Sequence, residues 1–283
     1  MSDQRTALVL GGGITGIAWM TGLVAGLAEA GVDVRTADMV VGTSAGSVVG
    51  AQLRSGTPVE ELYAYQASPY VAKPGEQVAS ISPSVLTRYA VAFLRGRGDS
   101  RRMCRALGAY AVAQTRAGRT PTLEERYAAI RERLPSLEWP AEPLVATAVD
   151  VATGELRGLD AASGVSLLEA VAASCAVPGV YPPVPLEGRD HVDGGARSYV
   201  NADLARDCER VLVLAPVDRA IGPMRRASEQ LAGVRHEVVR PDARSREAIG
   251  RNVLDPARRS ISAEAGRAQA AEVVDRVRAL WED

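Results

Sequence analysis

A serine at position 44 has the neighbours that a nucleophile needs. It is the centre of Gly42-Thr43-Ser44-Ala45-Gly46, a Gly-x-Ser-x-Gly pentapeptide. Such a serine can occupy a sharp strand-to-helix turn that exposes its hydroxyl, and the glycines avoid a clash on either flank. The apolar residues 39–41 predict the strand before it, and residues 45–54 predict the helix behind it. Because 27 of the 283 residues are glycine, the pentapeptide alone is weak evidence.

A glycine-rich loop follows the first predicted strand, residues 7–10, and precedes a predicted helix over residues 17–30. The loop, Gly11-Gly12-Gly13-Ile14-Thr15-Gly16, also fits Gly-x-Gly-x-x-Gly, so a nucleotide-binding α/β protein is the main alternative. That fingerprint needs an acidic residue at the end of the second strand, and Asp33 lies before this strand instead. Next to a serine nucleophile, the same backbone amides can hold the oxyanion of a tetrahedral intermediate. We favour this second interpretation.

Two further segments contribute candidate residues. Asp193, in Asp193-Gly194-Gly195, ends a predicted strand and leaves its carboxylate at an open edge, although alone this is an ordinary Asp-Gly turn. The small residues of Ala173-Ser174-Cys175-Ala176-Val177-Pro178 indicate backbone that runs close to another element, and we expect Cys175 to be a core residue. Asp150 lies beside a predicted hairpin turn, which favours a structural hydrogen-bonding role.

Taken in this order, the four motifs resemble the patatin-like phospholipase family, over residues 7 to about 201. The resemblance implies a three-layer α/β/α fold with a mainly parallel central sheet, and a Ser–Asp dyad that hydrolyses acyl esters of lipids. By residue match, Ser44 would be the nucleophile, Asp193 its base, and Gly11, Gly12 and Gly13 the oxyanion loop. The chain departs from the family at Thr15, where members often carry Arg or Lys.

A histidine-containing triad is the competing mechanism. The two histidines are His191, two residues before Asp193, and His236, in a predicted strand over residues 234–239. In a strand, His191 and Asp193 would face the same side, and His236 follows the serine and the aspartate as in α/β-hydrolases. The dyad predicts that activity survives replacement of both histidines, whereas the triad predicts that it is lost.

Composition narrows the possible partners. A formal net charge of -1 gives no support to nucleic-acid binding. Three widely spaced cysteines form neither a disulfide framework nor a zinc pattern, and we expect no cofactor, no metal and a reducing, cytoplasmic location. Residues 6–28 are uncharged and long enough to span a bilayer, but three consecutive glycines break them, so strand, loop and buried helix are expected.

We expect residues 1–283 to form a single domain with a helical and loop insertion at about 68–140. Within it lies the basic run Arg95-Gly96-Arg97-Gly98-Asp99-Ser100-Arg101-Arg102, which we interpret as solvated, with peripheral contact to membrane phosphates as the alternative. Strands are also predicted over residues 144–151 and 210–215, and a final amphipathic helix begins at Asp255-Pro256 and packs on the sheet. The sequence therefore predicts a serine hydrolase whose substrate is a lipid or fatty-acyl ester. The alternatives are a nucleotide-binding protein or an inactive lipid-binding member of the family.

Overall fold

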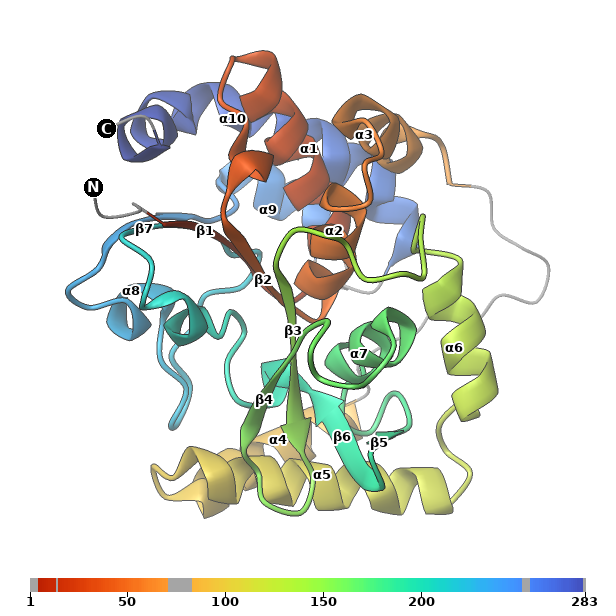
Figure 1. Cartoon of the computed structure of the whole chain (residues 1–283). Coiled ribbons are helices and arrows are strands. Elements are labelled where there is room, and N and C mark those ends of the chain that lie inside the picture. The colour runs from red at the N-terminus through yellow and green to blue at the C-terminus, as the bar shows by residue number, and fades with distance from the viewer. Residues whose placement is uncertain (1–4, 14, 71–82, 251–254, 282–283) are drawn as a thin grey trace.

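A mixed sheet forms the centre of the computed structural model, which describes residues 5–13, 15–70, 83–250 and 255–281 (Figure 1). Within these residues the sheet has eight strands in the order β5-β6-β3-β2-β1-β7-β8, with β4 paired to β3. Five neighbouring strands of the sheet are parallel: β3, β2, β1, β7 and β8. The other three strands, β4, β5 and β6, pair antiparallel. The strands are Thr6–Leu10 (β1), Met39–Thr43 (β2), Leu144–Asp150 (β3), Leu156–Leu159 (β4), Val184–Leu186 (β5), Arg189–Asp193 (β6), Arg210–Leu214 (β7) and Arg235–Val239 (β8).

Helices cover both faces of the sheet because the central strands are apolar on both sides. In β1, Leu8 and Leu10 join one core, and Ala7 and Val9 join another. The helices on the first face are Gly16–Glu29 (α1), Ala45–Leu53 (α2), Val59–Ala67 (α3), Leu123–Arg131 (α6), Leu167–Ser174 (α7), Ala243–Ile249 (α9) and Arg259–Trp281 (α10). Those on the second face are Pro83–Gly96 (α4), Ser100–Arg116 (α5) and Ala227–Gln230 (α8), with the 3-10 helix Ala202–Ala205 (η3). The predicted three-layer α/β/α fold is confirmed.

The uncharged N-terminal stretch becomes β1 and α1, as predicted. Helix α1 is buried along nearly its whole length because α10 lies directly against it. A Cβ atom at Gly22 would overlap the carbonyl oxygen of Ala263, and one at Gly266 would overlap that of Trp19, so glycine is needed for this close approach. None of the helices in the described part of the chain is both long enough and apolar enough to cross a membrane.

Two predicted details of the helices differ in part from the structure. The sequence predicts a short helix over residues 58–66, with Thr57 as its cap and Pro58 as its first residue. In the structure Pro58 is itself the N-cap of α3, because its ψ of 136° is extended. The final helix contacts strands β7 and β8 of the sheet, as expected, and packs most extensively on α1. Asp255-Pro256 opens a short 3-10 helix, Pro256–Arg258 (η4), before α10 begins.

The stretch expected to be an insertion supplies α4, α5 and α6. Residues 71–82, which belong to that stretch, lie outside the described residues, as does Ile14 of the glycine loop. Helices α4 and α5 pack on each other, and α5 also contacts β3, β6 and the 3-10 helix Gly194–Ala196 (η2). Helix α6 packs on α7 at the opposite face of the sheet. The stretch therefore contributes helices to both faces.

Candidate active site

The nucleophile candidate lies where β2 ends and α2 begins. Ser44 has φ 54° and ψ -119°, a left-handed conformation that a residue other than glycine rarely adopts. Holding a serine there costs about 1–3 kcal/mol, so the surrounding structure must enforce the turn. Ser44 is only 7% exposed, and the first residue of α2 is Ala45, directly after it. This is the strand-to-helix turn that the pentapeptide predicts.

The two glycines of the pentapeptide are required by close packing. A Cβ atom at Gly42 would lie 2.5 Å from the Cα atom of Ser47, and one at Gly46 would overlap the carbonyl oxygen of Leu10. Strand β1 and helix α2 therefore approach each other at Gly46 closely enough to exclude any side chain. This contact fixes the start of α2 and, with it, the position of Ser44.

The sheet register brings Asp193 to the same place. Thr43 pairs with Thr147 across β2 and β3, so Ser44 follows at the level of Ala148. On the other side of β3, Ala148 pairs with Asp193, the last residue of β6. The Ser44 side chain thus lies within hydrogen-bonding reach of the Asp193 carboxylate and lowers its pKa. Two residues 149 positions apart in sequence are brought to one place.

The Asp193 carboxylate is suited to accept a proton. It is only 3% exposed, and its burial raises the pKa of Asp193 to about 6 from the usual 3.8. Hydrogen bonds from the Ser44 hydroxyl and from the Gly195 N–H, the latter at 2.6 Å, act in the opposite direction and lower this pKa, as does the charge of Arg126. At neutral pH the carboxylate is therefore ionised, yet it is a stronger base than an exposed aspartate.

Three consecutive small residues at the end of α7 contact Ser44, Asp193 and Arg126. The Ser44 N–H donates to the hydroxyl of Ser174 at 2.9 Å, and the Asp193 N–H donates to the carbonyl of Ala176 at 3.0 Å. Between them, the Cys175 carbonyl accepts from Arg126 at 3.0 Å. The density of small residues at 173–178 is explained by this contact, because the segment runs directly beside both members of the pair. Cys175 is buried, as expected of a core residue, and its burial raises the pKa of its thiol.

Arg126, on α6, is a buried cation that sequence reasoning missed. It is only 3% exposed, and its guanidinium carbon lies 3.8 Å from the centre of the Tyr181 ring. Burial lowers the pKa of Arg126, and its Nε atom has no hydrogen-bond partner among the described residues. No sequence signal identifies it, because Arg126 lies on an otherwise ordinary polar helix and reaches the site only through the packing of α6 on α7.

The glycine loop adjoins the serine, but its amides differ in availability. A Cβ atom at Gly12 would lie 3.4 Å from that of Ser44, so the loop passes beside the Ser44 side chain. The Gly11 N–H already donates to Leu214 at 2.9 Å, and the Gly12 N–H to Tyr199 at 2.8 Å. In the described part of the chain the Gly13 N–H has no such acceptor. Among the described residues, the N–H of Gly13 is therefore the one most available to an oxyanion, and the oxyanion role of the three glycines stays a prediction.

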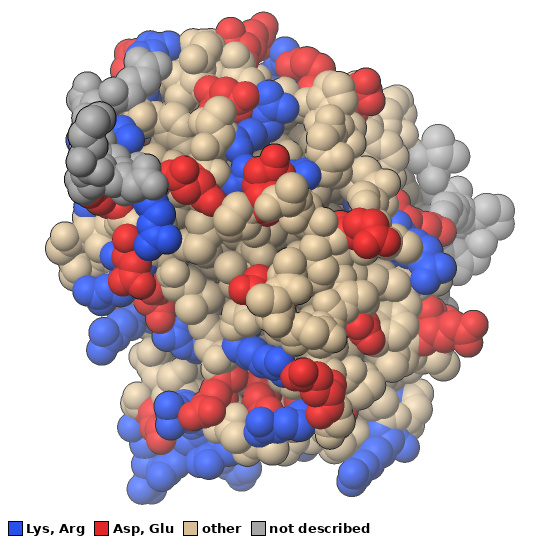
Figure 2. Space-filling view, viewed as in Figure 1, with Lys and Arg blue, Asp and Glu red and all other residues tan. Residues whose placement is uncertain are grey.

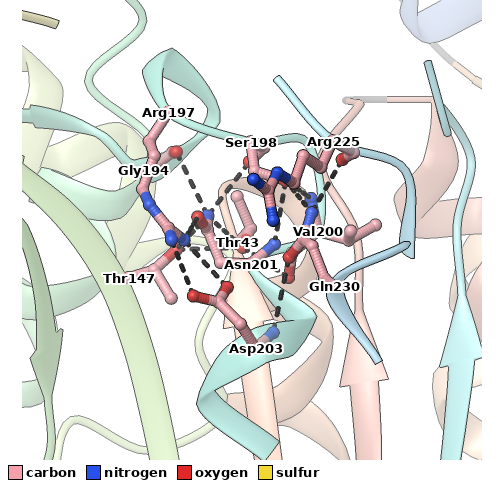
Figure 3. A network of polar contacts seen from close by, with 10 residues as sticks. All are labelled: Thr43, Thr147, Gly194, Arg197, Ser198, Val200, Asn201, Asp203, Arg225 and Gln230. Carbon is pink, nitrogen blue, oxygen red and sulfur yellow. Dashed lines mark hydrogen bonds and ion pairs between the residues drawn. The ribbon is translucent and has the colours of Figure 1, made fainter. Parts of the chain in front are cut away.

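A buried polar network fixes the two strands that carry the pair (Figure 3). Its centre is Asn201, which is fully buried and has a left-handed φ of 46°. The Asn201 amide nitrogen lies 3.1 Å from the Thr43 hydroxyl, next to the nucleophile, and 3.1 Å from the Gly194 carbonyl, next to the base. It also lies 3.0 Å from the Ser198 carbonyl, and the Thr147 hydroxyl donates to that of Thr43 at 2.9 Å.

An ion pair on the outside of this network orients the Asn201 amide. The Arg197 guanidinium donates to the Asn201 side-chain oxygen at 3.0 Å and pairs with Asp203 at 2.6 Å. Gln230 of α8 continues the network by donating to the Ser198 hydroxyl at 2.7 Å (Figure 3). Because the amide oxygen is held by a cation, the amide nitrogen must face the two strands. Asn201 thus joins the residue before Ser44 to the residue after Asp193.

The histidines of the competing triad are placed elsewhere. His236 lies on β8, three strands from β2 in the sheet, or roughly 14 Å at the usual strand spacing. His191 is fully buried and its Nδ1 contacts the Arg189 carbonyl at 2.8 Å, while the hydrogen bond to Asp193 comes from Ser44. Among the described residues the His191 Nε2 has no partner. The structure therefore brings Ser44 and Asp193 together without a histidine between them.

Two other acidic candidates have structural partners. The Asp150 carboxylate accepts from the N–H groups of Ala152 and Thr153 and pairs with Arg189 at 2.8 Å, which agrees with the expected structural role. Asp33, the residue that a dinucleotide site would need, caps a 3-10 turn and pairs with Arg35 at 2.7 Å.

Comparisons with known proteins found two similar solved structures at low identity. Among solved structures the chain is similar to VipD from Legionella pneumophila, at 13% identity and a TM-score of 0.47, covering 96% of this chain and 67% of that one. It is also similar to the type III effector protein ExoU, at 16% identity and a TM-score of 0.45, covering 97% of this chain and 53% of that one. The chain thus spans about two thirds of the first protein and about half of the second. No curated protein matches it.

The match to a protein family is more direct. The model of the patatin-like phospholipases covers residues 8–206, which include the glycine loop, the Ser44 turn, the small-residue segment and Asp193. These residues make up well over half of the chain. The protein therefore belongs to the patatin-like phospholipase family.

Proposed function

We propose that this protein is a serine hydrolase that cleaves acyl esters of lipids with a Ser44–Asp193 dyad. Family membership supports the broader activity of a lipid-ester hydrolase. The observation that supports the dyad is the sheet register, which brings Ser44 beside a buried carboxylate whose pKa is raised to about 6 by its burial. We further propose that residues 1–283 act as one domain, with residues 68–140 inserted in it.

In the proposed reaction, Asp193 takes the proton of Ser44 as the hydroxyl oxygen attacks the ester carbonyl. The negative charge that forms on the carbonyl oxygen is stabilised by the Gly13 N–H and by the Ala45 N–H at the start of α2, where the helix dipole is positive. Collapse of the tetrahedral intermediate breaks the ester bond. The departing alkoxide takes the proton from Asp193 and leaves an acyl group on Ser44.

Release of the acyl group repeats these steps with water. Asp193, again ionised, removes a proton from a water molecule whose oxygen attacks the acyl carbonyl. The intermediate collapses, the Ser44 oxygen is reprotonated by Asp193, and a free fatty acid leaves. The two half-reactions use the same base and the same amides, so the substrate's two oxyanions must form at one position.

Hydrolysis of a fluorogenic fatty-acyl ester tests the proposed dyad. Wild type should be active, Ser44→Ala should be inactive, and the double variant with His191→Gln and His236→Gln should retain most of the activity. Loss of activity in a folded double-histidine variant would favour a triad and refute the dyad. Addition of ATP or NAD tests the nucleotide-binding alternative, which predicts a rise in Tm with ligand and no hydrolysis.

A further inference from the structure

The exposed surface of α4 and α5 has a charge opposite to that of the rest of the chain. Residues 83–119 contain eight arginines and one aspartate, a formal charge of +7, so the remaining residues sum to -8. Five of the arginines lie at or near the junction of the two helices and a sixth lies farther back on α4, and all six are exposed: Arg95, Arg97, Arg101, Arg102 and Arg105, with Arg88. We call these six residues the arginine surface. Figure 2 shows basic side chains gathered at the lower left, where the start of α5 lies in Figure 1.

Few acidic side chains among the described residues balance the arginine surface. Within the described residues, one of the six arginines forms an ion pair with a carboxylate: Arg101 pairs with Glu155 at 3.0 Å, and both side chains are largely exposed. Asp99, the only acid in the region, is occupied as the N-cap of α5 and accepts from the Arg102 N–H. The first turn of α5 has no acidic residue and carries two arginines. Cations are unfavourable at this position because the positive end of the helix dipole lies there. Folding alone therefore does not explain this concentration of charge.

An exposed apolar side chain lies beside these cations. Leu94 is 79% exposed, more than any other large hydrophobic residue in the described part of the chain, and Arg95 follows it. Farther along α5, an open groove lined by Ala109, Val112, Ala113, Ala117 and Val151 is bordered by Arg116. Apolar side chains flanked by cations are typical of a protein surface that lies in the interface of an anionic bilayer.

The arginine surface and the candidate active site share the same two helices. Cys104 of α5 contacts the carbonyl of Ala196, in the turn directly after Asp193, at 3.5 Å. Tyr89 of α4 is partly buried and packs against the apolar cluster that contains Cys104 and Ala196. A partner bound to the outer side of α4 and α5 would therefore lie one helix layer from Ser44 and Asp193.

We propose that the arginine surface, together with Leu94, docks the protein on an anionic lipid surface. This inference rests on the proposed function, since a lipid-ester hydrolase must reach substrate held in a membrane. Leu94 would enter the headgroup region while the guanidinium groups contact lipid phosphates. A nucleic-acid partner is less favoured because the aromatic residues of α4, Tyr89 and Phe93, pack inward and are not available for stacking on bases.

Vesicle co-sedimentation of Ser44→Ala protein tests the docking surface without turnover. Binding to vesicles of phosphatidylcholine with about 30% phosphatidylglycerol should exceed binding to phosphatidylcholine alone, and should fall between about 50 mM and about 500 mM NaCl as charges are screened. The triple variant Arg95→Gln, Arg97→Gln, Arg102→Gln should lower the partition coefficient on the order of a hundredfold. Leu94→Gln should lower it roughly tenfold.

The matched control removes the same charge elsewhere. The control is a second triple variant, with Arg244→Gln, Arg258→Gln and Arg276→Gln. These arginines are exposed and lie on α9, η4 and α10, on the opposite side of the fold from α4 and α5 (Figure 1). This control should bind nearly as well as the parent protein. An equal loss in both triple variants, or no preference for the anionic vesicles, would overturn the inference. Binding to duplex DNA without binding to anionic vesicles would assign the surface to nucleic acid and also overturn it.

Labelling of Ser44 by a water-soluble fluorophosphonate separates this inference from the proposed function. If wild type is labelled but does not bind anionic vesicles, the docking surface is refuted and the hydrolase remains. If the protein binds anionic vesicles through the arginine surface but is never labelled, the proposed hydrolase fails while the docking surface stands on its own.

Discussion

Replacement of the proposed base should inactivate the protein and also stabilise it. Burial raises the pKa of Asp193 to about 6, against 3.8 for the exposed group. Between these two values the folded state holds a proton that the unfolded state has released, so the free energy of unfolding falls as pH rises. A difference of about 2 pKa units between the folded and unfolded states corresponds to about 3 kcal/mol in the free energy of unfolding. The wild type has lost this stabilisation once the pH exceeds 6.

Asp193→Asn resembles the protonated carboxyl and lacks this titration. The asparagine oxygen can still accept from the Gly195 N–H, and its amide can donate to the Ser44 hydroxyl. Above about pH 7 the variant should therefore be more stable than wild type by up to about 3 kcal/mol, or roughly 5 °C in Tm for a chain of this size. Near pH 4 the two proteins should unfold at the same temperature.

Thermal unfolding followed by circular dichroism between pH 4 and pH 8 measures this difference directly. Asp150→Asn is the matched control with the opposite sign. Although burial raises the pKa of Asp150, hydrogen bonds from Thr153 and the charge of Arg189 lower it overall. Its ionised form stabilises the fold above the unfolded pKa, so Asp150→Asn should lower the Tm at neutral pH. If Asp193→Asn is no more stable than wild type at pH 8, Asp193 does not carry a desolvated charge.

Three further substitutions test individual contacts of the site. Arg126→Met removes a charge that lowers the pKa of Asp193. The acid limb of the pH–rate profile should therefore move from about pH 6 to a higher pH, by up to about one unit, and an unchanged profile would contradict this. Asn201→Asp places a carboxylate against the Thr43 hydroxyl and the Gly194 carbonyl, and should slow labelling of Ser44 at least tenfold. Asn201→Gly, which keeps the left-handed backbone, should slow it less than the aspartate does. Gly46→Ala forces a methyl group onto the Leu10 carbonyl and should cost about 3 kcal/mol in denaturant unfolding, whereas an unperturbed midpoint would contradict the tight approach.

Much of the fold follows from local sequence signals. The apolar residues 7–10 and 39–41 become the central parallel strands β1 and β2, and Gly42 and Gly46 are needed for the reason that the pentapeptide implies. Patterns of this kind are local, because the periodicity of apolar residues and the conformational freedom of glycine act over a few residues. Helix boundaries are harder to predict. The sequence assigns the cap of α3 to Thr57, but Pro58 takes that position, because both residues are compatible with the start of a helix.

The rest of the site depends on contacts between distant segments. Nothing about Arg126 or Asn201 in the sequence shows that one lies beside Cys175 and the other between Thr43 and Gly194, because tertiary packing alone creates these neighbours. The hydrogen bonding of the glycine-loop amides also depends on distant segments. Its composition predicts free amides, but the acceptors that engage Gly11 and Gly12 are residues 214 and 199.

Covalent labelling with a fluorophosphonate, followed by peptide mapping, tests the dyad most directly. The adduct should form on Ser44 in wild type, disappear in Ser44→Ala, and form at least a hundredfold more slowly in Asp193→Asn while that variant remains folded. An adduct on another serine, such as Ser47 or Ser174, or equally fast labelling of Asp193→Asn, would contradict the pairing of nucleophile and base.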